Sequence, residues 1–217
     1  NYLDDNIEFN YEEVRIETEN NIELKSWFIN KDLKKNKTLV FFHGNAGNLL
    51  NRVHKLNKLN KLDINILIVS WRGFSGNYGK PTEKNLYFDA NQSIKWLNDR
   101  GIKNDRIILY GESLGTGVAV ELAKNNSFNS VILESPFTSI TNAAKIYYPY
   151  LPVNLLLKDK YDSLNKIDKI TDPVLIMHGM QDNVVPFSMG VELFNKANQP
   201  KYSFFPEDDD HMMNYND

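Results

Sequence analysis

Residues 106–115 read Arg106-Ile107-Ile108-Leu109-Tyr110-Gly111-Glu112-Ser113-Leu114-Gly115, and this stretch decides the fold. The aliphatic run before Gly111 predicts a buried strand, and the small and apolar residues up to Lys124 predict a helix. Ser113 therefore lies on a tight strand-to-helix turn, where side chains two positions to either side would collide with the neighbouring backbone. Glycine at both positions avoids this collision. Such a turn exposes the serine hydroxyl beside a helix N-terminus and the amide of the next residue.

Composition limits the class of protein. The chain has 217 residues, of which 41% are hydrophobic, and this is enough for one domain with a single sizeable core. The formal net charge is -3 and charges of both signs are interspersed, so we expect no nucleic-acid partner and no field that attracts an anionic membrane. Because the chain contains no cysteine, disulfides, thiolate catalysis and cysteine-bound zinc are excluded.

The sequence contains neither a signal peptide nor a run of about 18 apolar residues. It begins at Asn1 without a methionine, which suggests numbering that starts inside a longer gene product. We expect a soluble domain, cytoplasmic by default, that attaches to a membrane only if an anchor lies upstream. The sequence leaves the oligomeric state open.

Short apolar runs alternate with amphipathic stretches along the chain and predict an α/β protein. An antiparallel hairpin comes first, and a parallel sheet follows. The predicted strands are 13–17, 23–29, 38–42, 65–71, 106–110, 130–134, 173–177 and 201–205, and the predicted helices are 49–62, 82–101, 115–124 and 188–198. Between 135 and 169 the pattern loosens, and its tyrosines, prolines and leucines indicate short helices around a mouth.

Four of the predicted strand ends carry groups that suit nucleophilic catalysis. Ser113 follows one strand, and His43-Gly44-Asn45 follows another and offers a backbone amide to the same oxyanion. Asp182 lies in the loop after strand 173–177, and His211 follows the last strand. In an open parallel sheet these ends meet at one edge, where ligands bind. A serine nucleophile needs an imidazole base that a carboxylate holds in one tautomer, and the order serine, aspartate, histidine is a known order for such triads.

Each of these assignments has a structural alternative. Ser113 could only cap the helix, and Asp182 could only form a turn. Three other aspartates would then compete for the acid role: Asp162, Asp168 and Asp172. His211 is assigned as the base by position and by elimination, because we expect the remaining histidines to hydrogen-bond within loops or to face solvent: His43, His178 and His54. Residues 72–79 are expected to form a structural glycine-rich turn, with a substrate-facing loop as the alternative.

Four motifs that recur in order over nearly the whole chain carry a resemblance to a known family. They are His43-Gly44-Asn45-Ala46-Gly47-Asn48, Arg72-Gly73-Phe74-Ser75-Gly76, Gly111-Glu112-Ser113-Leu114-Gly115, and His178-Gly179 with Asp182 and Val185-Pro186. With them the chain resembles the α/β-hydrolase superfamily, most closely a branch of small serine hydrolases that includes protein depalmitoylase-like enzymes and their bacterial relatives. The motifs are specific to the fold and the triad, and much less specific to the substrate.

The resemblance implies the α/β-hydrolase fold, with a mostly parallel central sheet, an antiparallel N-terminal hairpin and helices on both faces. It implies one domain over 1–217 with a minimal, lid-like segment at about 136–169. Members of the family often carry an N-terminal membrane anchor. The implied site consists of Ser113 as nucleophile, His211 as base, Asp182 as acid, and the backbone amides near Asn45 and Leu114 as the oxyanion hole.

The sequence departs from the family pattern after its last predicted strand. Relatives have Asn after the histidine and then a closing helix, whereas here Met212-Met213 follow His211, so we expect that helix to be missing or truncated. Without it, the loop that holds His211 would be less well preorganised. Aspartates at 208–210 replace the small residues of relatives, at a position where they would raise the basicity of the histidine.

These observations predict a serine hydrolase without cofactor or metal. It would cleave carboxylic ester or thioester bonds of a small-molecule or acylated substrate through an acyl-enzyme intermediate. A serine peptidase with the same triad is the alternative among enzymes, and the lack of a large accessory domain speaks against it. A non-catalytic binding protein of hydrolase fold is the alternative from another class, and the presence of all three triad residues speaks against it.

Overall fold

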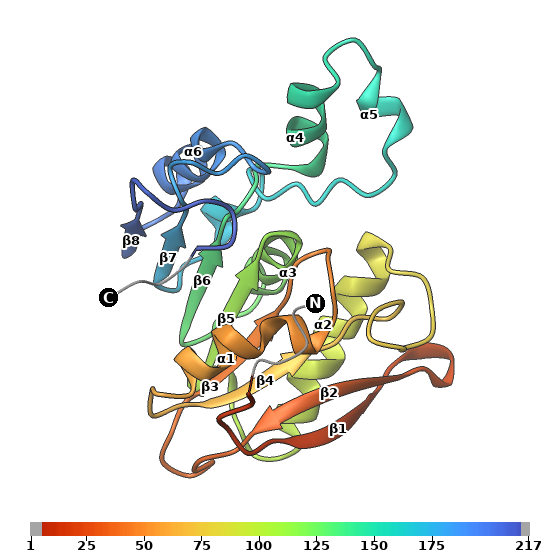
Figure 1. The fold of residues 1–217 in the computed structure, drawn as a ribbon, viewed down its shortest axis with the longest axis vertical. Coiled ribbons are helices and arrows are strands. Elements are labelled where there is room, and N and C mark those ends of the chain that lie inside the picture. Colours follow the sequence, from red (N-terminus) through yellow and green to blue (C-terminus); the bar gives the residue numbers. More distant parts are fainter. Residues whose placement is uncertain (1–5, 214–217) are drawn as a thin grey trace.

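An eight-stranded sheet runs through the computed structural model, which describes residues 6–213 (Figure 1). Its strand order is β1-β2-β4-β3-β5-β6-β7-β8. The strands are β1 (Glu12–Glu17), β2 (Glu23–Ile29), β3 (Thr38–Phe42), β4 (Asn65–Val69), β5 (Ile107–Glu112), β6 (Ser130–Glu134), β7 (Val174–Met177) and β8 (Lys201–Phe204). The first two strands form the predicted antiparallel hairpin, β2 also pairs antiparallel with β4, and all pairs from β4 to β8 are parallel. The predicted mostly parallel sheet with an antiparallel start is confirmed.

The helices connect these strands. They are α1 (Val53–Leu59), α2 (Glu83–Asn98), α3 (Leu114–Ala123), α4 (Ile140–Tyr147), α5 (Val153–Leu156) and α6 (Phe187–Lys196), with short 3₁₀ turns at η1 (Glu19–Asn21), η2 (Leu49–Arg52), η3 (Asn104–Arg106) and η4 (Ile167–Lys169). None of the helices within residues 6–213 has the length and apolar character needed to cross a membrane.

The helix predicted over 49–62 is wrong in type and length. Its first turn is the 3₁₀ turn η2, which begins at a reciprocal capping pair between Asn48 and Asn51, and the α-helix ends at Leu59. The ammonium group of Lys31 donates to the carbonyl oxygens of Asn60 and Leu62 and so satisfies backbone groups just beyond the helix. Polar contacts from a distant loop therefore help to set the end of α1, and the spacing of apolar residues in the sequence does not reveal such contacts.

Alternation along the central strands divides the core between the two faces of the sheet. On β3, Val40 and Phe42 face one side together with buried residues of α2, α3 and α6, whereas Leu39 and Phe41 face the side covered by α1. These residues are almost completely buried because helices cover both faces at the centre of the sheet. The predicted helices on both faces are confirmed.

The parallel strands bring the candidate residues to one edge. Ser113 follows β5, Asp182 follows β7 and His211 follows β8, so all three lie beyond the carboxyl ends of parallel strands within the run β5-β6-β7-β8. Between β6 and β7 the chain forms the short helices α4 and α5, as predicted, and they project past this edge at the top of Figure 1. The expected single domain includes residues 1–5 and 214–217, which lie outside the described residues, as does the place of the expected missing helix.

Candidate active site

Ser113 occupies a strained turn between β5 and α3. Its φ of 49° and ψ of -114° are sparsely populated for a residue with a side chain. A Cβ atom at Gly111 would lie 2.5 Å from the carbonyl oxygen of Gly115, and one at Gly115 would lie 1.9 Å from that of Phe42. The predicted need for glycine at both positions is confirmed. The Ser113 amide donates to the Glu134 carbonyl at 2.9 Å and ties the turn to β6.

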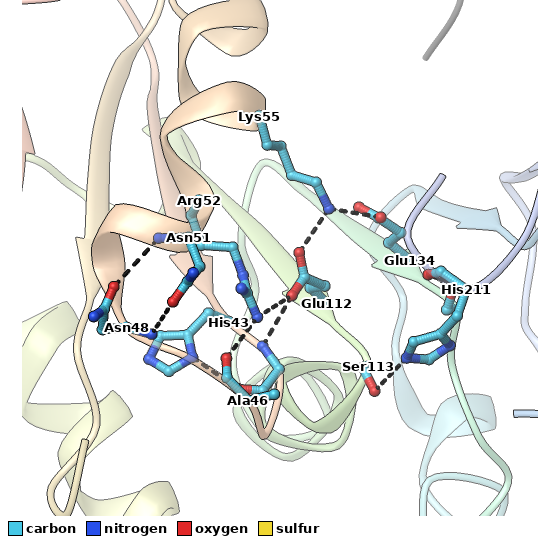
Figure 2. Close-up of polar contacts among 12 residues, drawn as sticks. His43, Ala46, Asn48, Asn51, Arg52, Lys55, Glu112, Ser113, Glu134 and His211 are labelled. Atoms are coloured by element: carbon cyan, nitrogen blue, oxygen red, sulfur yellow. Dashed lines mark hydrogen bonds and ion pairs between the residues drawn. The ribbon is translucent and has the colours of Figure 1, made fainter. Parts of the chain in front are cut away.

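The structure brings the three predicted triad residues into one chain of hydrogen bonds. His211 Nε2 lies 3.0 Å from Ser113 Oγ, and His211 Nδ1 lies 2.7 Å from Asp182 Oδ2 (Figure 2 shows the serine and the histidine). Because a carboxylate only accepts, Nδ1 carries the proton, and the Nε2 lone pair is left to accept from the serine hydroxyl. This is the tautomer that a general base next to a nucleophile requires.

Asp182 is held more firmly than a turn aspartate needs to be. Its Oδ1 accepts the amides of Val184 and Val185, each at 2.8 Å, and its Oδ2 lies 3.0 Å from His178 Nε2. Burial alone would raise the pKa of Asp182, but hydrogen bonds from His178, His211 and the Val185 amide outweigh it and hold that pKa well below its usual range. The carboxylate therefore stays ionised.

The rival aspartates lie in other hydrogen bonds, away from His211. Asp172 accepts from the Ser127 hydroxyl and the Phe128 amide, and Asp162 accepts from Asn165. Asp168 forms an ion pair with Lys196 at 3.5 Å. Among the candidate aspartates, only Asp182 contacts the histidine.

The other histidines contribute to structure. His54 is exposed on α1, as expected. His178 is fully buried, and its Nε2 lies 3.0 Å from the Val185 carbonyl oxygen as well as from Asp182, so it bonds within its loop and also supports the acid. His43 is buried beside Trp71 and bonds through Nδ1 to the Gly44 carbonyl oxygen at 2.7 Å. Burial lowers the pKa of His43 to about 4, which keeps it neutral.

Several contacts fix the loop that carries His211. The Ser135 hydroxyl donates to the His211 carbonyl at 2.9 Å, and the Gln181 amide donates to the Asp209 carbonyl at 3.0 Å. A Cβ atom at Gly179 would lie 2.3 Å from that same Asp209 oxygen, so glycine permits the close approach of the two loops. Of the three neighbouring aspartates, Asp210 uses its carboxylate to accept the Met212 amide at 2.9 Å.

A family model described as "alpha/beta hydrolase fold" matches residues 37–152, more than half of the chain. The chain belongs to this α/β-hydrolase family. An uncharacterized protein of Mycobacterium tuberculosis is 34% identical over 191 residues, which cover 87% of this chain and 68% of that protein. Human alpha/beta hydrolase domain-containing protein 17B is 38% identical over 165 residues, which cover 75% of this chain and 56% of the human protein.

Solved structures agree with the family. The esterase Pf2001 of Pyrococcus furiosus superposes with a TM-score of 0.76 at 25% identity, over 94% of this chain and 85% of the esterase. An acetyl xylan esterase from Paenibacillus sp. R4 has the same fold, with a TM-score of 0.75 at 19% identity over 92% of this chain and 78% of the esterase. The predicted α/β-hydrolase fold is confirmed.

The α/β-hydrolase also contains a buried ionic network beside Ser113 that the sequence analysis missed. Glu112 and Glu134 are partners in neighbouring strands, and Lys55 of α1 places its ammonium group 2.6 Å from a carboxylate oxygen of each (Figure 2). Arg52 pairs with Glu112 at 2.8 Å, and the Tyr110 hydroxyl donates to Glu134. All four charged side chains are at most 7% exposed, so the two cations compensate two carboxylates inside the protein.

The charges of this network set opposite pKa shifts on its two carboxyl groups. Burial favours the neutral form of Glu112, but Lys55 and Arg52 outweigh it and lower its pKa to about 2. Complete burial raises the pKa of Glu134, and the attraction of Lys55 does not offset it. Two acidic residues at the ends of adjacent apolar strands, together with a lysine on a buried helix face, are the signal that would have revealed this network from sequence.

The network holds the loop 43–48 beside Ser113. The Gly44 amide donates to Glu112 at 3.2 Å, and Arg52 donates to the Ala46 carbonyl at 3.1 Å. A Cβ atom at Gly44 would lie 3.3 Å from the Ser113 Cβ, so this loop passes directly by Ser113. The Trp71 indole also donates to the His43 carbonyl, at 3.0 Å. Glu112, within the G-x-S-x-G motif itself, therefore connects the turn of Ser113 to the loop that is predicted to bind the oxyanion.

The predicted oxyanion donors lie on these two elements. The Asn45 amide belongs to loop 43–48, and the Leu114 amide is at the N-terminus of α3. Neither amide donates to an acceptor among residues 6–213, so both are available to a ligand oxygen. Their catalytic role stays a prediction. In the same described range, no group of three or more His, Asp and Glu side chains has the arrangement of a metal site.

Arg72 and Asn77 give the glycine-rich stretch 72–79 the contacts of a structural turn, and a substrate-facing role for its other residues stays a prediction. Arg72 is buried and bonds to Asp89 and Glu19, with its Nε at 2.9 Å from the Asp89 carboxylate. Asn77 donates to the Ser70 carbonyl at 3.0 Å and accepts the Lys25 amide at 2.9 Å. This turn connects β4 and α2 to the N-terminal hairpin.

Proposed function

We propose that this α/β-hydrolase is a serine hydrolase that cleaves carboxylic ester or thioester bonds through an acyl-enzyme. The observation that carries the proposal is the hydrogen-bonded chain from Ser113 Oγ through His211 to Asp182, on a strained turn that presents the hydroxyl. Serine is a weak nucleophile unless a base accepts its proton during attack, and His211 Nε2 lies at the distance such a base needs.

In the proposed acylation step, Ser113 Oγ attacks the carbonyl carbon of the substrate while its proton moves to His211 Nε2. The carbonyl oxygen becomes an oxyanion, which the amides of Asn45 and Leu114 stabilise at the helix N-terminus. The intermediate then collapses, and the bond from carbon to the leaving oxygen or sulfur breaks. The leaving alcohol or thiol takes the proton from His211, and the acyl group remains on Ser113.

In the deacylation step, water attacks the acyl carbon and gives a proton to His211. The second tetrahedral intermediate expels Ser113 Oγ, which recovers that proton, and the carboxylic acid leaves. Asp182 keeps the imidazole in one orientation and stabilises its charged form without taking the proton itself. The low pKa of Asp182 fits this role, because the carboxylate stays negative whenever His211 becomes positive.

The similarity to an esterase supports an ester as the bond that this enzyme attacks. The solved structures with this fold include the Pyrococcus furiosus esterase at 25% identity. The short helices α4 and α5 follow β6, and we propose that they form a minimal lid that would admit an acyl chain presented on a larger molecule. We therefore propose acyl esters or thioesters as the substrate class.

Hydrolysis of nitrophenyl esters from acetate to palmitate tests this proposal. We expect activity with a maximum at one chain length, lost in both Ser113→Ala and His211→Ala and retained in Ser75→Ala. Ser75 is a matched control because it is also a loop serine with positive φ. A fluorophosphonate probe should label the wild type and Ser75→Ala but not Ser113→Ala. Rates that are the same in all four folded proteins would contradict the proposal.

A comparison of oxygen and sulfur esters with the same acyl chain then defines the leaving group. If both are hydrolysed with equal kcat, deacylation of a common acyl-enzyme limits the rate, as the mechanism requires when acylation is fast. Hydrolysis of peptides without hydrolysis of either ester would assign the same triad to a peptidase instead.

A further inference from the structure

We propose that residues 145–160, called the arm, form a surface that binds a lipid bilayer containing anionic lipids. The arm comprises the end of α4, all of α5 and the segment after it, and it projects past the edge of the sheet that carries the triad (Figure 1). With eight and four residues, α4 and α5 are far too short to span a bilayer. They are suited to lie in its interface.

The arm concentrates exposed apolar side chains to a degree that the rest of the described chain does not match. The most exposed is Tyr150 at 97%, followed by Leu155 at 85%. Other large apolar side chains between residues 146 and 156 are about half exposed or more, among them Ile146, Tyr148, Leu151 and Leu156. Soluble proteins rarely leave such a cluster in water unless it binds a partner or a membrane.

Contacts with the body of the protein hold the arm in this position. The Tyr147 hydroxyl donates to the carbonyl oxygens of Asn183 and Val184, at 2.8 and 2.9 Å, and Val153 is buried. At its far end, the Asp159 carboxylate accepts the Glu83 amide at 3.0 Å, and the Lys160 amide donates to Glu83 at 2.6 Å. The arm is therefore fixed at several points, while the exposed apolar side chains named above keep about half or more of their surface uncovered.

The charges of the arm identify the partner. Three lysines, at 145, 158 and 160, are exposed, and the only acid is Asp159, so the arm carries +3 - 1 = +2 within a chain whose net charge is -3. Asp159 is turned toward the N-terminus of α2 by its bond to Glu83. Tyrosines at the headgroup level, leucines in the acyl region and lysines facing lipid phosphates are the composition of an interfacial segment. Although the whole chain is negatively charged, the arm is locally positive and fits an anionic bilayer.

The arm is continuous with the rim of the candidate active site. Tyr147 bonds to Asn183 and Val184, the two residues that directly follow Asp182 in the same loop, and Val184 is 55% exposed. Met180 and Met212, on the loops that carry Asp182 and His211, are also exposed. A bilayer bound to the arm would thus face the triad. The delivery of a membrane-borne acyl chain to Ser113 rests on the serine hydrolase function proposed above, whereas the binding itself does not.

Vesicle flotation with the Ser113→Ala protein tests the binding independently of catalysis. We expect the protein to float with vesicles of phosphatidylcholine and phosphatidylserine, and much less with phosphatidylcholine alone. Replacing two apolar side chains of the arm, Tyr150→Ser with Leu155→Ser, should weaken binding by about tenfold, because it removes the two most exposed apolar side chains of the arm. The matched control, Tyr202→Ser with Leu62→Ser, also removes one exposed tyrosine and one exposed leucine, and it should bind as Ser113→Ala does.

A second measurement keeps the proposal testable if the double variant folds poorly. Tyr150→Trp adds a reporter at the most exposed position of the arm, and its difference emission against the wild type should shift to shorter wavelength when anionic vesicles are added. Failure of the wild type to float with either vesicle overturns the proposal, as does equal binding by the arm and control variants. A wild-type dimer that Tyr150→Ser with Leu155→Ser converts to a monomer also overturns it, because the arm would then be covered by a second copy. Hydrolysis of a water-soluble butyrate ester by the arm variant separates failure of this proposal from failure of the catalytic one.

Discussion

Ser113 and His211 of the candidate triad are held in place by different kinds of interaction. Ser113 follows a central strand, between glycines that pack against backbone, and above a network of charges that is almost completely buried. His211 lies on a loop beyond the edge strand β8, with a side chain that is 15% exposed, and is held by a few hydrogen bonds to Asp182, Ser113 and Ser135. Packing fixes the proposed nucleophile Ser113, and individual polar contacts fix the proposed base His211.

This difference predicts different effects on stability and activity for substitutions around Ser113, the nucleophile side, and around His211, the base side. A substitution on the nucleophile side disturbs the centre of the sheet, so we expect loss of stability together with loss of activity. A substitution on the base side removes contacts at the edge of the molecule, so we expect loss of activity with little change in stability. The predictions below test this distinction in order of decreasing effect.

The largest effect is expected for His211→Ala. Removing the base of an intact triad lowers kcat/KM by about 10⁴-fold or more, whereas the melting temperature should change little because the side chain is not part of the core. Ester hydrolysis and thermal unfolding of the same preparation measure both quantities. A large drop in melting temperature would show that the base side is also built into the fold, and the distinction would fail.

Glu112→Ala should destabilise the protein by about 3–5 kcal/mol, because it removes the carboxylate that pairs with both Arg52 and Lys55 and leaves two buried cations with Glu134 as the remaining carboxylate of the network. Urea unfolding measures the loss, and activity should fall with it because the Gly44 amide loses its acceptor. The matched control is Glu23→Ala, which breaks the exposed ion pair with Arg15 and should cost less than about 1 kcal/mol. Equal losses from both variants would contradict the role given to the buried network.

Low pH should destabilise the protein through His43, the first residue of loop 43–48. Burial lowers its folded pKa to about 4 from an ordinary value of 6.5, so between these pH values the unfolded chain binds a proton that the folded protein excludes. The free energy of unfolding therefore falls as the pH falls through this window, by about 3 kcal/mol for a shift of this size. His43→Asn, which keeps a donor for the Gly44 carbonyl, should flatten this part of the stability profile; an unchanged slope would assign the acid sensitivity to other groups.

Ser135→Ala should have the smallest effect. It removes the hydroxyl that donates to the His211 carbonyl, and the loss of one such bond is worth about 1 kcal/mol, or roughly fivefold in kcat/KM. The melting temperature should stay near that of the wild type. Ser203→Ala, an exposed serine on β8, is the control and should leave both quantities unchanged. If Ser135→Ala lost more stability than activity, the bond from Ser135 to His211 would stabilise the fold and would not position His211 for catalysis.

Local patterns in the sequence determined most of the sheet. The apolar run 38–42 and the stretch 130–134 with its apolar centre predicted two strands with the bounds that β3 and β6 have. The two glycines around Ser113 predicted the turn, because the collision that they avoid involves backbone only a few residues away or in the adjacent strand. The positions of Asp182 and His211 after predicted strands were sufficient to propose their roles, since parallel strands bring their ends to one edge.

Only the tertiary structure decided which side chains meet across that edge. Glu112 and Glu134 became neighbours through the register of two strands, and Lys55 reached Glu134 from 79 residues away. The second imidazole on Asp182 and the bond from Tyr147 to the loop of Asp182 likewise join distant segments. Periodicity reports the face on which a residue lies, whereas these contacts depend on how far each element is shifted along its neighbour. That shift is set by the packing of the whole sheet, and no local stretch of sequence encodes it.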